Sequence, residues 1–242
     1  MSRRRDDRDD APRPARSRDG SSARSRSTST TPRSGSARTD SVSRAEQKAR
    51  TRAALIEAAL DLSRTQGFSG LSLRDVARAA GIVPTAFYRH FDSLDDLGIA
   101  LAEEGMRIAR GISREIRRRA PQDLAASMQI LADQVDAYPD ELRFVVTERY
   151  SAPAEVRRAL NLEMRLLTSE LAIDLARRDD MREWDPAELT SAANLILGIA
   201  TNAVAELVQP DADAEETIRT ATDSMRMAFV GLTNWRSAEA SR

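Results

Sequence analysis

Apolar residues recur every three or four positions along most of this 242-residue chain, which is the spacing of amphipathic helices. After residue 93, for example, Leu97, Leu101, Ile108 and Ile112 share one helical face. No run of alternating apolar and polar residues predicts a strand. We therefore predict an all-α protein. Its helices are expected over residues 45–66, 94–119 and 213–236, as a pair within 72–91, and from near Pro121, Pro139, Pro153 and Pro186 onward.

Residues 72–91, SLRDVARAAGIVPTAFYRHF, carry the signals of two short helices joined by a tight turn. Ser72 is the expected N-cap of the first helix, and Gly81 is its expected end because glycine adopts a left-handed conformation at little cost. Pro84 suits the first position of the second helix, where its missing N–H costs nothing. This pattern predicts a helix-turn-helix, which places its second helix in the major groove of DNA. That second helix is expected to carry the side chains of Thr85, Tyr88, Arg89 and His90.

Charge is distributed unevenly along the chain and divides it into three segments. The net charge of the whole chain is −1, but residues 1–43 carry +5, residues 44–92 carry +3 and residues 93–242 carry −9. The basic N-terminal part is expected to face a polyanion, and the acidic part to face away from it. The near-neutral total is therefore compatible with DNA binding.

The three segments predict three different kinds of structure. Residues 1–43 contain no Leu, Ile, Phe, Trp or Tyr, so we predict a disordered tail, because little apolar surface is available to offset the entropy of ordering. This tail either solubilises the protein or adds nonspecific attraction to phosphates. Residues 44–92 are expected to form the helix-turn-helix DNA-binding domain, and residues 93–242 a larger helical domain.

Several classes of chemistry are not expected. The chain has no cysteine and a single histidine, which excludes disulfides, zinc fingers, thiol catalysis and multi-histidine metal sites. It also lacks a phosphate loop and an H-E-x-x-H pattern, so an α-helical enzyme is not favoured, and we expect no catalytic residue, metal or cofactor. No apolar run is long enough to cross a bilayer, and no apolar signal core begins the chain. The expected protein is cytoplasmic, with no membrane partner.

Three motifs occur in order within residues 45–100: AALIEAALDLSRTQGF, LSLRDVARAAGI and AFYRHF. Their combination resembles the DNA-binding domain of the TetR-type bacterial transcriptional regulators. The resemblance implies a three-helix DNA-binding domain followed by a helical ligand-binding and dimerisation domain. Leu94 stands where the family usually has a lysine. A purely architectural DNA-binding protein is a weaker alternative, because it would leave the large acidic domain without a role.

A narrower resemblance involves RAEQKARTR, the whole of SLRDVARAAGIVPTAFYRHF, LDDLG and FVVTERYS. These segments resemble the FabR/DesT-like TetR-type repressors of unsaturated fatty acid synthesis and desaturation. That resemblance implies a repressor whose operator affinity is modulated by long-chain acyl-CoA or acyl-ACP. The alternative is a TetR-type regulator of efflux or degradation genes that responds to another hydrophobic ligand, such as a planar drug. The small number of aromatic residues after residue 93 favours an aliphatic ligand.

The resemblance and the residue chemistry together predict a DNA-binding surface. Thr85 and Ala86 offer a hydroxyl and methyl groups to base edges, and Arg89 is expected to contact guanine or phosphate unless it is a solvated surface charge. Two copies of this surface in a homodimer would bind a palindromic double-stranded operator. The predicted DNA-binding residues are Lys48, Thr51, Arg52, Ser72, Arg74, Pro84, Thr85, Ala86, Tyr88, Arg89 and His90.

A long acyl chain requires an apolar tunnel in the second domain, although most apolar positions of any helical domain are simply core. Glu148 and Arg149 match a Glu-Arg pair of the narrower group, and Arg149 is expected either to hold a phosphate or carbonyl of the ligand or to form an interhelical salt bridge. The resemblance implies that the ligand shifts the helix over 94–119 and so changes the separation of the two recognition helices. The predicted ligand-binding residues are Met128, Leu131, Val135, Phe144, Val145, Glu148, Arg149, Leu160, Met164, Leu167, Leu195 and Ile199.

Overall fold

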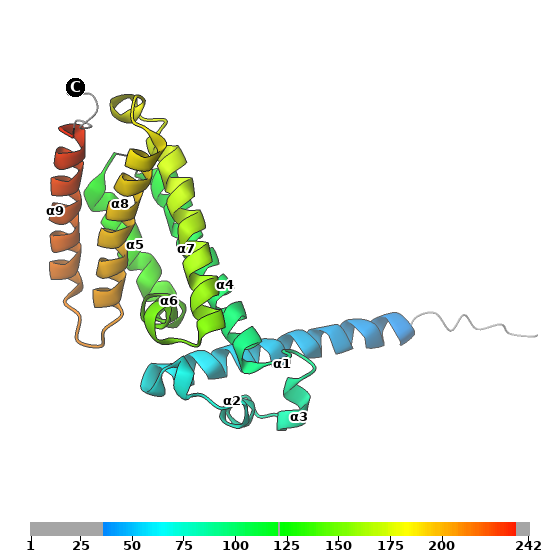
Figure 1. Ribbon diagram of the computed structural model, residues 1–242. Coiled ribbons are helices and arrows are strands. Elements are labelled where there is room, and N and C mark those ends of the chain that lie inside the picture. The colour runs from blue at the N-terminus through cyan, green and yellow to red at the C-terminus, as the bar shows by residue number, and fades with distance from the viewer. Residues whose placement is uncertain (1–35, 121, 236–242) are drawn as a thin grey trace, which may run out of the picture. The chain divides into compact units, whose positions relative to one another are not determined.

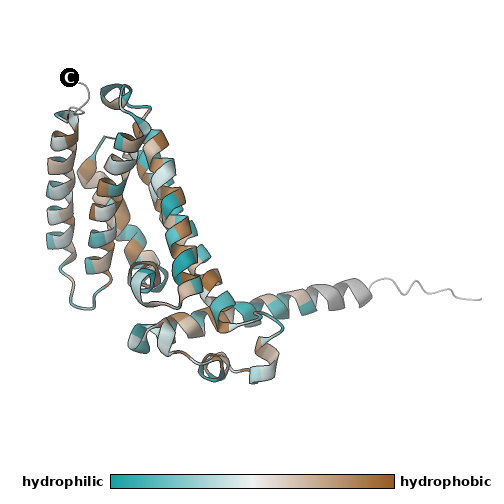
Figure 2. Cartoon of the chain, viewed as in Figure 1, coloured by the Kyte–Doolittle hydropathy of each residue, from teal (hydrophilic) through white to brown (hydrophobic). Residues whose placement is uncertain are grey.

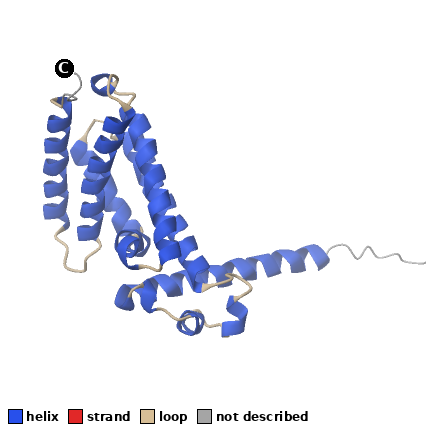
Figure 3. Ribbon diagram, in the orientation of Figure 1, coloured by secondary structure: helices blue, strands red, loops and turns tan. Residues whose placement is uncertain are grey.

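The computed structural model describes residues 36–120 and 122–235, and for residues 36–42 it describes the backbone alone. Within these ranges the chain is helical and contains no strand, which confirms the predicted all-α class (Figure 3). The elements are α1 (Ser36–Gln66), η1 (Phe68–Gly70), α2 (Leu73–Ala79), α3 (Pro84–Phe87), α4 (Leu94–Arg119), α5 (Leu124–Ala137), α6 (Pro139–Ser151), α7 (Ala154–Leu175), η2 (Asp179–Met181), α8 (Pro186–Leu207) and α9 (Ala214–Thr233).

Local sequence signals explain where most of these helices begin. The side chain of Ser93 accepts a hydrogen bond from the backbone N–H of Asp96 at 3.0 Å and caps α4. Asp185 and Glu188 form a capping box at the start of α8, in which each side chain accepts from a backbone N–H of the other residue. Pro139 occupies the first turn of α6, where the backbone N–H that a proline lacks would have no partner within the helix.

The first helix is longer than predicted. It begins at Ser36 instead of near residue 45, so the last part of the segment predicted as a disordered tail, 1–43, is helical. Once a helix is nucleated, each added residue gains a hydrogen bond, and Ala37, Arg38 and Arg44 are good helix formers that favour such an extension. The remainder of the predicted tail, residues 1–35, lies outside the described residues.

Residues from Ser43 onward form one compact unit, and every contact described below lies within it. The part of this unit up to residue 92 is called the N-terminal module below. In it, Leu55 of α1 and Val76 of α2 are fully buried together with Phe68, and Phe87 and Phe91 complete the same core from α3 and the turn that follows it. These three phenylalanines therefore hold the module together.

The part of the same unit that follows residue 92 is called the larger domain below. It is a bundle in which α4 packs against α5, α6 and α7, and α8 packs against α7 and α9 (Figure 1). Its helices alternate apolar and polar positions, as Figure 2 shows by the brown and teal bands along each ribbon. One core cluster, which includes Leu101 and Met106, continues from the N-terminal module along the first half of α4 to α6 and α7. A second, which includes Ile108 and Ile112, joins the second half of α4 to α5, α8 and α9.

Two glycines allow α4 to approach its neighbours closely. A Cβ atom at Gly98 would lie 2.6 Å from Val156 Cγ2 of α7 and 2.7 Å from the ring of Phe68. A Cβ atom at Gly105 would lie 2.5 Å from Val145 Cγ2 of α6. Side chains of the N-terminal module, α6 and α7 therefore pack directly against the backbone of α4 at these two glycines.

Candidate nucleic-acid interface and ligand cavity

The predicted helix-turn-helix is present. The N-cap of α2 is Ser72, whose side chain accepts a hydrogen bond from the backbone N–H of Asp75 at 3.2 Å. After α2 the chain turns at Gly81, where φ is +71°, a value that favours glycine. Pro84 then occupies the first turn of α3, as its missing N–H predicts.

The recognition helix is shorter than predicted. It ends at Phe87, so Tyr88, Arg89 and His90 do not continue a regular α-helix as expected. Instead, the backbone N–H of Arg89 donates to the carbonyl of Ala86 at 3.2 Å, and that of His90 donates to Phe87 at 2.8 Å. These bonds span three residues, as in a tightened final helical turn, and this turn carries the three side chains.

The predicted DNA-binding residues are accessible from outside. Thr51, Ala86 and His90 are half-buried and the other eight are exposed, with 60% of Tyr88 open to solvent. Two of the predicted hydroxyls are already used within the protein, because Thr51 Oγ1 donates to the carbonyl of Gln47 and Ser72 caps α2. The most available polar groups of this surface are therefore the hydroxyls of Thr85 and Tyr88 and the cationic side chains.

Positive charge on this surface is not neutralised internally. Among the described residues, no carboxylate forms an ion pair with Lys48, Arg52, Arg74 or Arg89, whereas most arginines of the larger domain have such partners. The guanidinium of Arg52 lies 4.8 Å from the centre of the Phe91 ring, which ties α1 to the end of the recognition segment. Unpaired cations on one exposed surface are suited to the phosphates of nucleic acid.

His90 is placed among these cations. Partial burial lowers the pKa of its imidazole below the usual 6.5, and the positive charges of Lys48, Arg52 and Arg89 lower it further. Its Nδ1 atom is buried and has no hydrogen-bond partner within the described part of the chain. The imidazole is therefore neutral at neutral pH.

We expect the one histidine of the chain to titrate below pH 6.5, as measured from its single imidazole Cε1–H resonance by NMR. Because the unfolded chain binds this proton more readily than the folded one, His90 stabilises the fold above pH 6.5, and this contribution falls as the pH drops through the folded-state pKa. The difference in unfolding free energy between the wild type and His90→Gln should change in that range. A pKa at or above 6.5 in the free protein would contradict this assignment.

The larger domain contains a cavity of about 770 Å³ between α4, α5, α6, α7, α8 and α9. This volume lies within the range of about 300–1,000 Å³ that is usual for small-molecule sites. Its wall is largely aliphatic, and its single aromatic side chain is Phe229. The wall residues from α4, α7 and α8 include Ile112, Leu171, Ile196 and Ala200.

Charged residues line one end of this cavity, where α4 and α7 finish. Arg117 and Arg177 both pair with Asp174, the latter at 3.1 Å. Arg178 donates two hydrogen bonds to Asp180, both at 3.0 Å, which lower the pKa of that carboxyl group. This end is therefore polar but its charges are balanced, and an incoming anion would have to replace carboxylates at the arginines.

Five of the twelve predicted ligand-binding residues line this cavity: Met128, Leu131, Val145, Met164 and Leu167. Ile112, which the apolar spacing placed on one face of its helix, also lines this cavity, as do Ile116, Leu171 and Phe229. None of these four was predicted to bind a ligand. No signal in the sequence separates a wall residue from a packed one, because both face inward.

The structure places the other seven predicted residues outside this cavity. Val135, Phe144 and Leu160 are packed inside the two cores. Leu195 is 47% exposed on α8 and, with Ile199, lines a separate hollow between α8 and α9. Apolar character alone could not distinguish these three environments.

The Glu-Arg pair is also placed differently from the prediction. Arg149 lines a smaller polar hollow and donates from Nε to Asn161 Oδ1 at 3.2 Å, which is an interhelical hydrogen bond but not a salt bridge. Glu148 is 3% exposed and points away from the cavity. Its Oε1 accepts from the backbone N–H of Phe68 at 2.8 Å, and its Oε2 accepts from the hydroxyl of Ser151 at 2.8 Å. Glu148 therefore joins α6 to the N-terminal module.

None of the described helices combines the length and apolar character needed to span a membrane. In the same residues, no cluster of three or more acidic, histidine or cysteine side chains is arranged to hold a metal ion.

Residues 55–101, from the middle of α1 to the first turns of α4, match the family described as bacterial regulatory proteins, tetR family. Residues 55–101 therefore carry a DNA-binding domain of the TetR family. The match covers the helix-turn-helix and the predicted DNA-binding residues from Ser72 to His90, whereas Lys48, Thr51 and Arg52 precede it. It confirms the TetR-type resemblance for this segment.

Several solved structures share the fold of about three quarters of this chain. The structure of AibR in complex with isovaleryl coenzyme A and operator DNA has a TM-score of 0.56 at 21% identity and covers 76% of this chain and 97% of its own. FadR from Bacillus subtilis in complex with stearoyl-CoA also has a TM-score of 0.56, at 15% identity, covering 74% of this chain and 97% of its own. SCO4454, a TetR-family transcriptional regulator from Streptomyces coelicolor, has a TM-score of 0.58 at 18% identity, covering 77% of this chain and 97% of its own.

Proposed function

We propose that this regulator is a repressor of fatty acid synthesis or desaturation genes, and that a long-chain acyl-CoA or acyl-ACP in the cavity modulates its operator affinity. The observation that carries the proposal is the large aliphatic cavity with a polar end, inside a helix-turn-helix regulator. Such a cavity suits a flexible hydrocarbon chain whose polar group remains near solvent.

On the DNA side, the proposal assigns the contacts to α3, the turn after it and the neighbouring parts of α1 and α2. Thr85 and Arg89 are exposed and available to base edges, and Arg74 and Lys48 are available to phosphates. The remaining predicted residues complete the same surface, with Arg52 and Ser72 acting chiefly to hold it in place.

On the ligand side, the nature of the wall favours an aliphatic chain over a planar aromatic molecule. Phe229 is its one aromatic member, and the methionines Met128 and Met164 adapt readily to a flexible chain. The AibR and FadR structures, which hold isovaleryl coenzyme A and stearoyl-CoA, support a thioester of this chemical class.

A homodimer is part of the proposal. Leu195 on α8 and Met227 and Val230 on α9 expose 47%, 67% and 58% of their surface, although all three are large and apolar. Exposed apolar residues on adjacent helices are typical of an interface, and a two-fold dimer would present two recognition segments to a palindromic operator.

The proposal predicts that palmitoyl-CoA or oleoyl-CoA changes operator affinity, whereas free CoA does not. The measurement is fluorescence anisotropy of the purified protein on its own promoter region, at one fixed salt concentration because phosphate contacts make affinity salt-dependent. A change of about fivefold or more with the acyl thioesters is expected from typical coupling between two sites. Specific DNA binding without any acyl response would retain the regulator and refute the acyl ligand.

A further inference from the structure

Helix α6 contacts both the cavity and the DNA-binding module. Leu142, Val145 and Val146 line the cavity. Asp140 and Glu148, about two turns apart, do not line it and interact with α1 and η1 instead. A displacement of α6 at the cavity wall would therefore also displace Asp140 and Glu148, which hold the DNA-binding module.

The contact near the end of α6 is made by Glu148. Its carboxylate is buried and, among the described residues, has no cationic partner; it is held by the backbone N–H of Phe68 and the hydroxyl of Ser151. The hydroxyl of Ser69 donates to the carbonyl of Ser151 at 2.7 Å and adds a second link between η1 and α6. Because Gly67 has no side-chain cap to offer, Glu148 supplies the acceptor at the start of η1.

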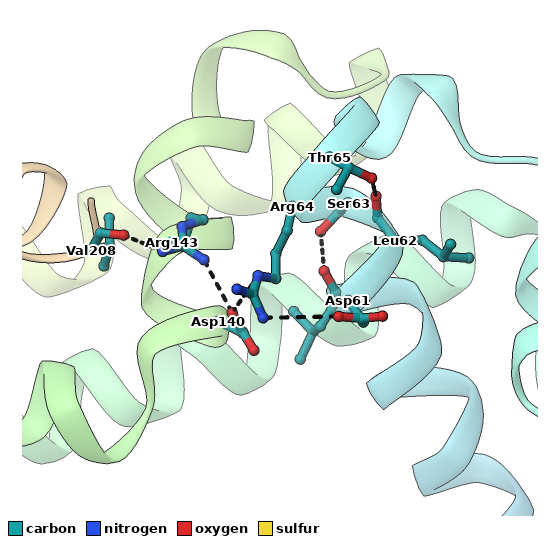
Figure 4. Close-up of polar contacts among 9 residues, drawn as sticks. Asp61, Leu62, Ser63, Arg64, Thr65, Asp140, Arg143 and Val208 are labelled. Atoms are coloured by element: carbon teal, nitrogen blue, oxygen red, sulfur yellow. Dashed lines mark hydrogen bonds and ion pairs between the residues drawn. The ribbon is translucent and has the colours of Figure 1, made fainter. Parts of the chain in front are cut away.

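The contact near the start of α6 is a chain of charged groups (Figure 4). Arg64 of α1 lies between Asp61 and Asp140, with its Nε 3.5 Å from Asp140 Oδ1. The same Asp140 oxygen lies 3.2 Å from Arg143 Nη1, and Arg143 also donates to the carbonyl of Val208 after α8. This chain connects α1 to α6 and α6 to the end of α8.

Between these two contacts the surfaces are tightly packed. The edge of the Phe68 ring meets the Phe144 ring with centroids 5.6 Å apart and planes at 88°. The same ring lies against Gly98 of α4. Phe68 therefore has little freedom to absorb a displacement of α6 locally.

We propose that Glu148 and Asp140 are positioning residues that fix the DNA-binding module to α6 and transmit displacement of the cavity wall to η1 and α1. This inference rests on the proposed function, because it requires a ligand in the cavity. These two residues give α6 a direct noncovalent connection to the module. The larger domain is also connected to the module covalently, where the chain continues into α4.

The test uses the full-length protein and measures three quantities: the Kd for palmitoyl-CoA without DNA, and the operator Kd with and without saturating palmitoyl-CoA. The variants are Glu148→Ala, Glu148→Gln and Asp140→Asn. Asp140 is 32% exposed, so its variant retains a test if Glu148→Ala fails to fold. The control is Glu155→Gln, which alters an exposed carboxylate of α7 paired with Arg158 alone among the described residues.

In the wild type, the operator Kd values with and without palmitoyl-CoA are expected to differ by about fivefold or more. In Glu148→Ala and Asp140→Asn, they are expected to differ by less than about threefold. The Kd for palmitoyl-CoA should stay within about threefold of the wild type, since neither residue lines the cavity. Glu148→Gln should recover part of the ratio, because its amide oxygen still accepts from the N–H of Phe68.

Variants that melt at a lower temperature but keep the wild-type ratio would show a structural role only and overturn the inference, while leaving the proposed function intact. A wild-type protein that binds operator but shows no response to palmitoyl-CoA would overturn both. A ratio that also collapses in Glu155→Gln would overturn the specific role of these two residues.

Discussion

Phe68→Ala is expected to lower the free energy of unfolding by about 3–5 kcal/mol, the usual cost of removing a fully buried phenylalanine ring. Its side chain has no exposed surface and lies at the point where η1, α4, α6 and α7 meet. Collapse of the surrounding structure into the resulting cavity is limited, because Gly98 and Val156 belong to the regular helices α4 and α7. This is the largest single-residue effect on stability that we predict.

Chemical denaturation followed by circular dichroism measures this change. Tyr150→Ala is the matched aromatic control: that side chain is 73% exposed, so its removal should change the unfolding free energy by no more than about 0.5 kcal/mol. If Phe68→Ala lowered the unfolding free energy by less than about 1 kcal/mol, the helices around Phe68 would be able to close the cavity that its ring leaves, which would contradict this prediction.

The positions of most helices could be predicted because their signals are local. The α4 bounds, Leu94–Arg119, agree with the predicted 94–119, since Ser93 caps the start and the apolar stripe is uninterrupted. The extension of α1 to Ser36 could not be predicted, because a polar helix leaves no apolar periodicity. The early end of α3 at Phe87 was missed for a different reason: a tightened turn and an α-helix have the same sequence pattern.

The functional sites were predictable to different degrees. The predicted DNA-binding residues all come from one continuous segment, 48–90, so they could be proposed together from its motifs. The cavity is formed by six helices, and whether an inward residue such as Phe144 or Met164 meets a hollow or a packed neighbour depends on the spacing of those helices. The hydrogen bond of Glu148 to the backbone N–H of Phe68 could not be predicted, because the two residues are 80 positions apart and no local sequence signal connects them.

Ala200→Phe is expected to weaken binding of palmitoyl-CoA by about fiftyfold. Ala200 lines the cavity from α8 and is half-buried, so a phenyl ring attached there would occupy space that the acyl chain needs. Excluding three methylene groups from the cavity would cost about 2.4 kcal/mol, at about 0.8 kcal/mol for each, and this corresponds to about fiftyfold in Kd. Shorter acyl-CoA molecules should lose less affinity, because they need less of the cavity.

Isothermal titration calorimetry with palmitoyl-CoA and octanoyl-CoA measures both affinities, and operator binding is measured separately by anisotropy. The control is Ala187→Phe, an exposed position on the same helix, which should leave both ligand affinities unchanged. Operator affinity of ligand-free Ala200→Phe should also be unchanged, because this residue belongs to the cavity wall and not to the DNA-binding module. Equal losses for the long and short chains would indicate a distorted domain, whereas unchanged palmitoyl-CoA affinity would place the acyl chain outside this cavity.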